Sequence, residues 1–184
     1  MNKTFRIAVV SLILAFLCGF ASHRGAYDYY RLKTGNFLYD NEVREIKSTV
    51  KLFSDTVAGF YATGGSVSGL NMFPAEKMVK RRIFQDINTW KDSGKLFVLD
   101  RDKLAIKEVK FISPDRAIAV SDENWFSVLQ DSQTRRQISG KKADFITVRY
   151  FLKKMWGKWI VGDYEVYPQG EILPPLTVER LAAW

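Results

Sequence analysis

The chain is poor in two residues that proteins often use for chemistry, with one cysteine, Cys18, and one histidine, His23, among 184 residues. Both lie in or beside an apolar run near the amino terminus, so the rest of the chain has neither residue. This excludes from the rest a disulfide framework, a thiolate nucleophile, a sulfur-ligated zinc site and a histidine-based triad. We therefore expect no cofactor and no metal site there, and we predict that the protein is not an enzyme.

A glycine-rich phosphate loop is also lacking. The stretch "GGSVSG", residues 64–69, has no lysine after it and follows a helical pattern rather than a strand. The sequence therefore offers no nucleotide-binding signature.

Acidic residues are absent from the start of the chain. Beyond the first 24 residues the chain has 25 basic and 20 acidic residues, a net charge of +5. A mildly basic surface can face lipid headgroups, phosphates or an acidic protein, and it can also simply be solvated. We do not expect nucleic acid as a partner, because the bias is small and an exported domain rarely meets it.

An uncharged run from Ile7 to Ala21 follows Lys3 and Arg6, which is the layout of an export signal. The run is short for a membrane span of about 20 residues, but flanking aromatic residues can lie at the interface. Cleavage after Ala21 is the alternative. We predict an uncleaved anchor whose apolar side chains face lipid, namely Ile7, Val9, Leu12, Leu14, Phe16, Leu17 and Phe20.

This anchor predicts a single-pass protein of the inner cell membrane with its carboxyl-terminal bulk on the periplasmic, outer face. The predicted organisation is an anchor and interface segment (1–30), a linker (31–39), a folded domain (40–168) and a proline-containing tail (169–184).

Two helices are predicted at the start of the domain. In the first, apolar residues from Val43 to Phe60 recur at spacings of three and four; Asp40 or Asn41 can cap its start, and Gly64-Gly65 ends it. The second has Pro74 in its first turn and ends at Gly94. Its apolar side carries Val79, Ile83, Ile87 and Trp90.

The pattern then changes to four β-like runs, which are rich in β-branched and aromatic residues. They cover residues 103–112, 116–130, 143–154 and 158–168. Short turns at residues 113–116 and 155–158 predict antiparallel pairing, and residues 130–142 form an exposed polar loop. The predicted class is α+β, with two or more helices on a curved four-stranded antiparallel sheet, and Val178 to Trp184 can add a short helix.

This order, ending in "TVRYFLKKMWGKWIVGDYEVYP", resembles the nuclear-transport-factor-two-like cone fold over about Asp40 to Pro168. With a membrane anchor added, the architecture is similar to the bridging subunits of type IV secretion systems. That resemblance implies a non-enzymatic structural or assembly subunit of an envelope complex, homo- or hetero-oligomeric, whose partners are membrane lipid and other protein subunits. The alternative is a small-ligand-binding protein or enzyme that uses the cone pocket.

Charged residues inside the sheet are the candidates for chemistry. Strand alternation suggests that Glu123, Arg149 and Asp163 project from one face. We predict a structural ion pair between Glu123 and Arg149, because a lone buried charge is costly. The functional alternative is that Asp163, with Tyr164 or Glu123, acts as an acid or base on a small apolar ligand.

Surface residues are the candidates for interaction. Lys77, Lys80 and Arg81 share one face of the second helix and can bind anionic lipid or an acidic partner, or simply be solvated. Trp156, at a hairpin tip, and Trp184, at the terminus, are predicted contacts with other subunits.

Overall fold

The computed structural model describes residues 35–65 and 73–184, and the chain divides into two compact units, residues 1–42 and 43–184. Of the first unit, only residues 35–42 are described, and they begin helix α2. The second is called the folded unit below. No helix in the described ranges combines the length and apolar composition that crossing a bilayer requires. The predicted anchor, Ile7 to Ala21, lies outside these ranges.

Helix α2 spans Gly35–Thr63 and buries the predicted stripe, including Ile46, Val50, Phe53 and Phe60. The predicted end is confirmed: Gly64 and Gly65 both have positive φ angles, and Gly65 N–H donates to the Phe60 carbonyl at 2.8 Å. The predicted start is wrong. Residues 35–39, assigned to an extended linker, are already helical, so neither Asp40 nor Asn41 caps the helix.

Helix α3 spans Lys77–Asp92 and buries Val79, Ile83 and Ile87 as predicted. It begins later than the sequence suggested, because the segment before it pairs with the sheet. Val161 N–H donates to the Pro74 carbonyl at 2.8 Å, and Glu76 N–H donates to the Val161 carbonyl at 2.9 Å. Pro74 therefore lies outside the first turn of the helix.

Four antiparallel strands follow in the order β1-β2-β3-β4, which confirms the predicted α+β class. They are β1 (Lys95–Ser113), β2 (Arg116–Asp131), β3 (Lys142–Met155) and β4 (Lys158–Pro168). Strand β1 starts well before the predicted Lys103. The apolar run from Leu96 to Leu99 pairs with β2, although Asp100 and Asp102 interrupt the apolar pattern after it.

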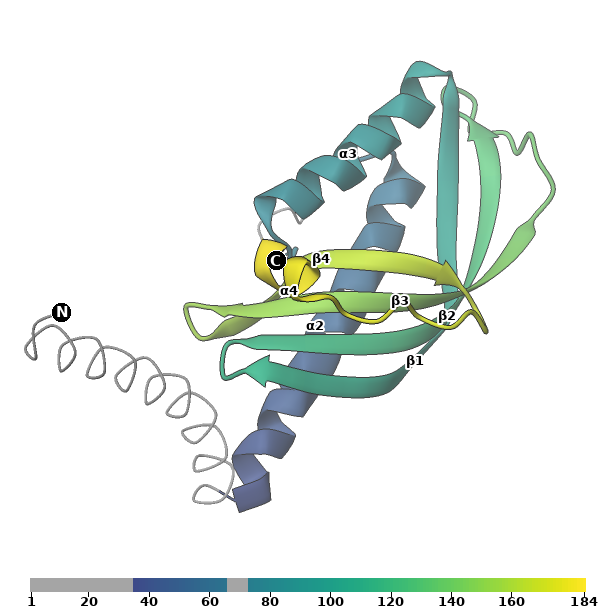
Figure 1. Cartoon of the computed structure of the whole chain (residues 1–184). Helices are drawn as coiled ribbons and strands as arrows, with labels where there is room; N and C mark the ends of the chain where they lie inside the picture. The colour runs from purple at the N-terminus through teal and green to yellow at the C-terminus, as the bar shows by residue number, and fades with distance from the viewer. Residues whose placement is uncertain (1–34, 66–72) are drawn as a thin grey trace, which may run out of the picture. The chain divides into compact units, whose positions relative to one another are not determined.

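The sheet is strongly curved, and helices α2 and α3 cover its concave face (Figure 1). Register shifts in β1, between Arg101 and Lys103 and between Ile106 and Glu108, mark bulges that bend a strand. The core lies between the helices and this face. It includes the buried side chains of Ile83 from α3 and of Leu152, Trp159 and Val161 from the sheet.

A bulge in β4 changes which side chains face the core. Val161 pairs with Leu152, but Asp163 pairs with Phe151, so Gly162 is an extra residue. Val161 therefore faces inward, while Asp163 faces outward. The tail beyond β4 returns over this outer face and ends in helix α4 (Val178–Ala183), whose start is capped by Thr177.

Candidate functional site

A cavity of about 280 Å³ lies on the concave face of the sheet, against α2. Strands β1 to β4 and helix α2 each contribute to its walls. The lining is mostly aromatic and aliphatic and includes Phe53, Val57, Phe97, Leu99, Ile146 and Tyr164. Glu123 and Asp144 are the two carboxylates among the lining residues. The cavity is therefore an apolar space with few polar groups, which is the usual composition of a ligand pocket.

Glu123 is fully buried on this face, and its carboxylate accepts four hydrogen bonds from side chains. Oε1 accepts from Ser121 Oγ at 2.7 Å and from the Tyr150 hydroxyl at 2.6 Å. Oε2 accepts from Trp125 Nε1 at 2.8 Å and from Ser54 Oγ at 3.3 Å. A carboxylate has about four acceptor positions, so the chain's own donors use all of them.

The donors of this cluster come from different elements. Ser121 and Trp125 lie on β2, each two residues from Glu123 and on the same side of the strand. Ser54 belongs to α2 and Tyr150 to β3. Burial, followed by the negative charge and hydrogen bond of Glu123, raises the pKa of Tyr150 well above its ordinary value. Tyr150 therefore stays protonated and remains a donor.

The predicted ion pair between Glu123 and Arg149 is wrong. Glu123 pairs in register with Ile146, which is three residues from Arg149, so the two charged side chains lie on opposite faces of the sheet. Arg149 instead pairs with Glu165 on the outer face at 3.3 Å. If the pairing of two strands shifts by one residue, the side chains of one strand move to the opposite face of the sheet relative to those of the other.

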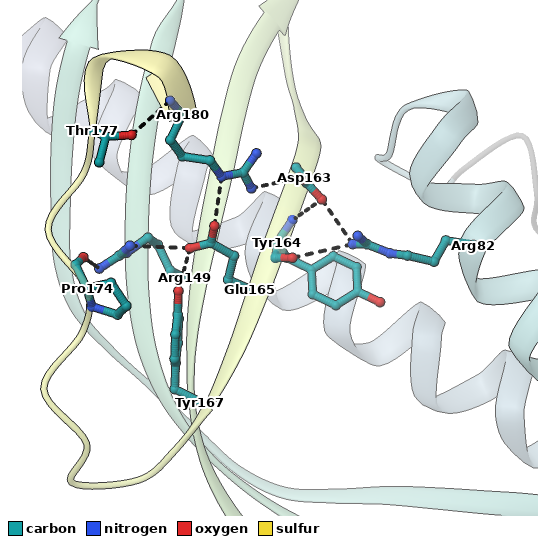
Figure 2. A network of polar contacts seen from close by, with 9 residues as sticks. All are labelled: Arg82, Arg149, Asp163, Tyr164, Glu165, Tyr167, Pro174, Thr177 and Arg180. Atoms are coloured by element: carbon teal, nitrogen blue, oxygen red, sulfur yellow. Dashed lines mark hydrogen bonds and ion pairs between the residues drawn. The ribbon is translucent and has the colours of Figure 1, made fainter. Parts of the chain in front are cut away.

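An ion-pair network on the outer face fastens the carboxyl-terminal tail to the sheet (Figure 2). From α4, Arg180 bonds to Asp163 and to Glu165, both at 2.7 Å. Arg149 donates to the Pro174 carbonyl at 2.7 Å. Two acidic residues of β4 and a buried arginine of β3 therefore hold two points of the tail.

Arg82 extends the network to helix α3. Its guanidinium donates to Asp163 at 3.0 Å and lies 4.3 Å from the centre of the Tyr164 ring (Figure 2). The suggested acid–base pair of Asp163 with Glu123 is therefore excluded, since Asp163 lies outside the cavity and is held by arginines. Sequence reasoning missed the roles of Arg82 and Arg180, because their partners are distant in the chain.

Trp184 packs within its own chain, whereas the sequence suggested a contact with another subunit. Its ring lies 5.3 Å from that of Phe151 on the outer face, and the Arg116 guanidinium lies 5.5 Å from the Trp184 ring. Gly162 leaves room for it, since an added Cβ there would be 2.7 Å from Trp184 Nε1. The terminus is thus part of the fold of this unit.

We expect acid to release the tail. Burial raises the pKa values of Asp163 and Glu165, but hydrogen bonds and the charges of nearby arginines outweigh it, so both lie below the ordinary 3.8 and 4.5. The two carboxylates therefore stabilise the docked tail fully when the pH is above their ordinary pKa values. This stabilisation is lost as the pH falls from there towards their lowered pKa values in the folded state. Trp184 emission, obtained by subtracting the spectrum of the Trp184→Phe variant, should shift to longer wavelength in this range.

Arg180→Ala is the reference for the released state. It should show the shifted Trp184 emission already at neutral pH, while the free energy of unfolding falls by only about 1 kcal/mol because the pairs are partly solvated. A Trp184 signal that changes only when the whole unit unfolds would contradict this account.

The predicted interaction residues lie near one end of the folded unit. Lys77 and Arg81 are exposed on α3, and Lys80 is half-buried, 5.7 Å from the centre of the Phe73 ring. Trp156 is 94% exposed at the turn between β3 and β4. Lys153, beside this turn, forms an ion pair with Glu76 just before α3. The structure therefore brings two separately predicted segments together.

The described residues offer no evident place for a metal ion, since residues 35–65 and 73–184 contain no cluster of three or more histidine, cysteine or acidic ligands. Glu123 cannot accept from a ligand without losing an internal donor. The cavity can therefore enclose an apolar group, but its buried carboxylate is already engaged.

No family model matches the sequence, and no curated protein sequence is similar to it. Among solved structures, the intermembrane space region of the chloroplast protein ARC6 superposes with a TM-score of 0.58 at 12% identity, over 68% of this chain and 96% of that one. An NTF2-like protein of unknown function from Prochlorococcus marinus has a TM-score of 0.33 at 16% identity, over 55% and 66%. The first similarity shows a shared fold alone, and the second is too low to support an argument.

Proposed function

We propose that the protein is a non-catalytic, single-pass membrane protein of the cell envelope, whose folded unit acts as a structural or assembly subunit through protein contacts. The observation that carries this proposal is the closed set of hydrogen bonds around Glu123. A general acid or base must exchange a proton with substrate, and this carboxylate is committed to Ser54, Ser121, Trp125 and Tyr150.

Exposed apolar residues near the end of β4 support a protein contact. Phe145 is 56% exposed, and Val166 and Ile172 are also exposed. Gln169 N–H donates to the Phe145 carbonyl at 3.1 Å, so these residues come from neighbouring segments. We call Phe145 and Ile172 the apolar rim, since Val166 pairs with Val148 and lies on the other face of the sheet, beside the cavity. Exposed apolar side chains are typical of protein interaction sites.

Extraction of the full chain from its native membrane in mild detergent tests this function. Sizing and mass spectrometry should find a stable assembly with other protein subunits. Phe145→Lys, on the apolar rim, should reduce co-purification at least about tenfold, since a desolvated charge at an interface costs more than 1.4 kcal/mol. Ile138→Lys, at a similarly exposed apolar site (51%) in the loop before β3, should have no effect. A monomer with both variants unchanged would contradict the proposal.

The cavity supports a second candidate, a carrier of a small apolar ligand. The observation that favours this candidate is the apolar cavity of about 280 Å³. In this case, the same extraction yields a monomer, and native mass spectrometry detects a bound small molecule.

The resemblance to bridging subunits favours a secretion or conjugation machine as the assembly. That assignment, the position of the folded unit outside the inner membrane and the uncleaved anchor all stay predictions. Detection of a mature chain that begins at Ser22 and remains soluble would contradict the tether.

A further inference from the structure

One end of the folded unit is built from two segments that are far apart in the sequence. They are residues 74–82, at the start of α3, and residues 153–158, around the β3–β4 turn; together we call them the basic end. The backbone bonds between Pro74, Glu76 and Val161 hold the first segment against β4. Lys154 N–H also donates to the Asp115 carbonyl at 2.8 Å, which fixes the two hairpin turns side by side.

The basic end carries a strong positive bias. Its two segments contain seven basic residues and one acidic residue, Glu76, which is paired with Lys153. Arg82 is also paired, with Asp163 outside these segments. Lys77, Arg81 and Lys158 are exposed. These three exposed cations therefore give this end a positive surface.

An exposed tryptophan stands within this positive surface. Trp156 (φ 48°) and Gly157 (φ 76°) form the two-residue turn between β3 and β4, a backbone geometry typical of tight hairpins. Because the flanking strands are paired up to Met155 and Lys158, the turn presents the indole on a rigid support. Met78 on α3 adds a second exposed apolar side chain.

The first turns of α2 within the folded unit lie near this same end. The unit begins at Val43, and Thr49, less than two helical turns later, lies with its hydroxyl 3.4 Å from the Trp159 carbonyl. Tyr61, near the other end of α2, instead contacts Phe97 near the start of β1. The part of α2 around Thr49 therefore lies on the side of the basic end.

We propose that the basic end docks on the anionic headgroups of the membrane that holds the tether, with Trp156 at headgroup depth. The inference rests on the proposed tether. Lysine and arginine attract anionic lipid, and tryptophan prefers the membrane interface, where its ring is partly buried and its N–H stays hydrated. An acidic protein would also attract the charges, but an indole that is 94% exposed beside them favours a bilayer interface.

The test uses the full chain with vesicles of phosphatidylcholine, alone or mixed with phosphatidylglycerol, whose acyl chains carry bromine as a fluorescence quencher. The signal of Trp156 is the difference between the chain and its Trp156→Phe variant. We expect it to be quenched several-fold more in the anionic vesicles. The triple variant Lys77→Ala, Arg81→Ala, Lys158→Ala should remove that difference, and added salt should weaken it.

A matched triple variant removes the same charge from the far end. Lys91, Lys95 and Arg136 are exposed, and their replacement by alanine should leave the quenching of Trp156 unchanged. Quenching that does not depend on anionic lipid, or that both triple variants reduce equally, would overturn the proposal. The proposal would also be overturned if Trp156 were shielded in a purified protein assembly but not in vesicles, because that result identifies a protein contact.

Failure of the tether gives a different result. If a high-salt wash removes the chain from vesicles of phosphatidylcholine alone, the proposed anchoring by residues 7–21 is wrong. Binding to anionic vesicles that depends on Lys77, Arg81 and Lys158 would still support the docking surface, and its absence would overturn it.

Discussion

Replacement of Glu123 by alanine is expected to lower the free energy of unfolding of the folded unit by about 3–5 kcal/mol. Four buried donors would lose their acceptor. The apparent melting temperature should fall by about 10 °C or more for a unit of this size. Urea titration followed by circular dichroism measures the loss.

Two variants calibrate this result. Glu123→Gln preserves the side-chain volume but places an amide donor opposite two existing donors. Its decrease in the free energy of unfolding should therefore be smaller than that of Glu123→Ala but still measurable. Glu108→Ala, at an exposed site on β1, should change stability by less than about 0.5 kcal/mol. Unchanged folding of Glu123→Ala, together with the loss of a measurable turnover, would instead identify Glu123 as a catalytic residue.

Phe53→Ala should lower the free energy of unfolding by a similar amount, about 3–5 kcal/mol. The Phe53 ring lies 5.1 Å from that of Phe73, 5.5 Å from that of Tyr164 and 5.7 Å from that of Tyr150. It therefore joins α2 to the segment before α3 and to two strands. Its removal loses these aromatic contacts and enlarges the apolar cavity, which the surrounding side chains can fill only in part.

The neighbouring residue provides the control. Leu52→Ala removes a comparable apolar side chain from the same helix turn, but Leu52 is exposed, so the loss should stay within about 0.5 kcal/mol. Equal losses for the two variants would mean that helix propensity, rather than packing of the aromatic cluster, controls stability here.

Sequence periodicity predicted the elements well, because it depends on local geometry. The spacing of apolar residues identified α2 and α3, and both helices end at glycines with positive φ angles. Helix starts were less predictable. Pro74 suits the first turn of a helix, but its carbonyl is instead bonded to β4, a partner that no local pattern reveals.

Strand alternation holds within β2, where Glu123 and Trp125 share a face, but it could not relate one strand to the next. Strict alternation would place five residues of β4 on one face, namely Trp159, Val161, Asp163, Glu165 and Tyr167. The bulge at Gly162 divides them, so Trp159 and Val161 face the core while Asp163 faces outward. Because alternation does not give the register between strands, it also led to the incorrect pairing of Glu123 with Arg149.

The sequence by itself determined the α+β class, the order of the elements, the lack of histidine and cysteine chemistry in the folded unit and the exposure of Trp156. These follow from composition and from periods of two and 3.6 residues, which each segment carries within itself. The tertiary structure alone decided that four donors surround Glu123, that arginines hold the tail and that the basic end gathers on one surface. Each of these depends on strand register, on one bulge and on contacts between residues that are distant in the chain.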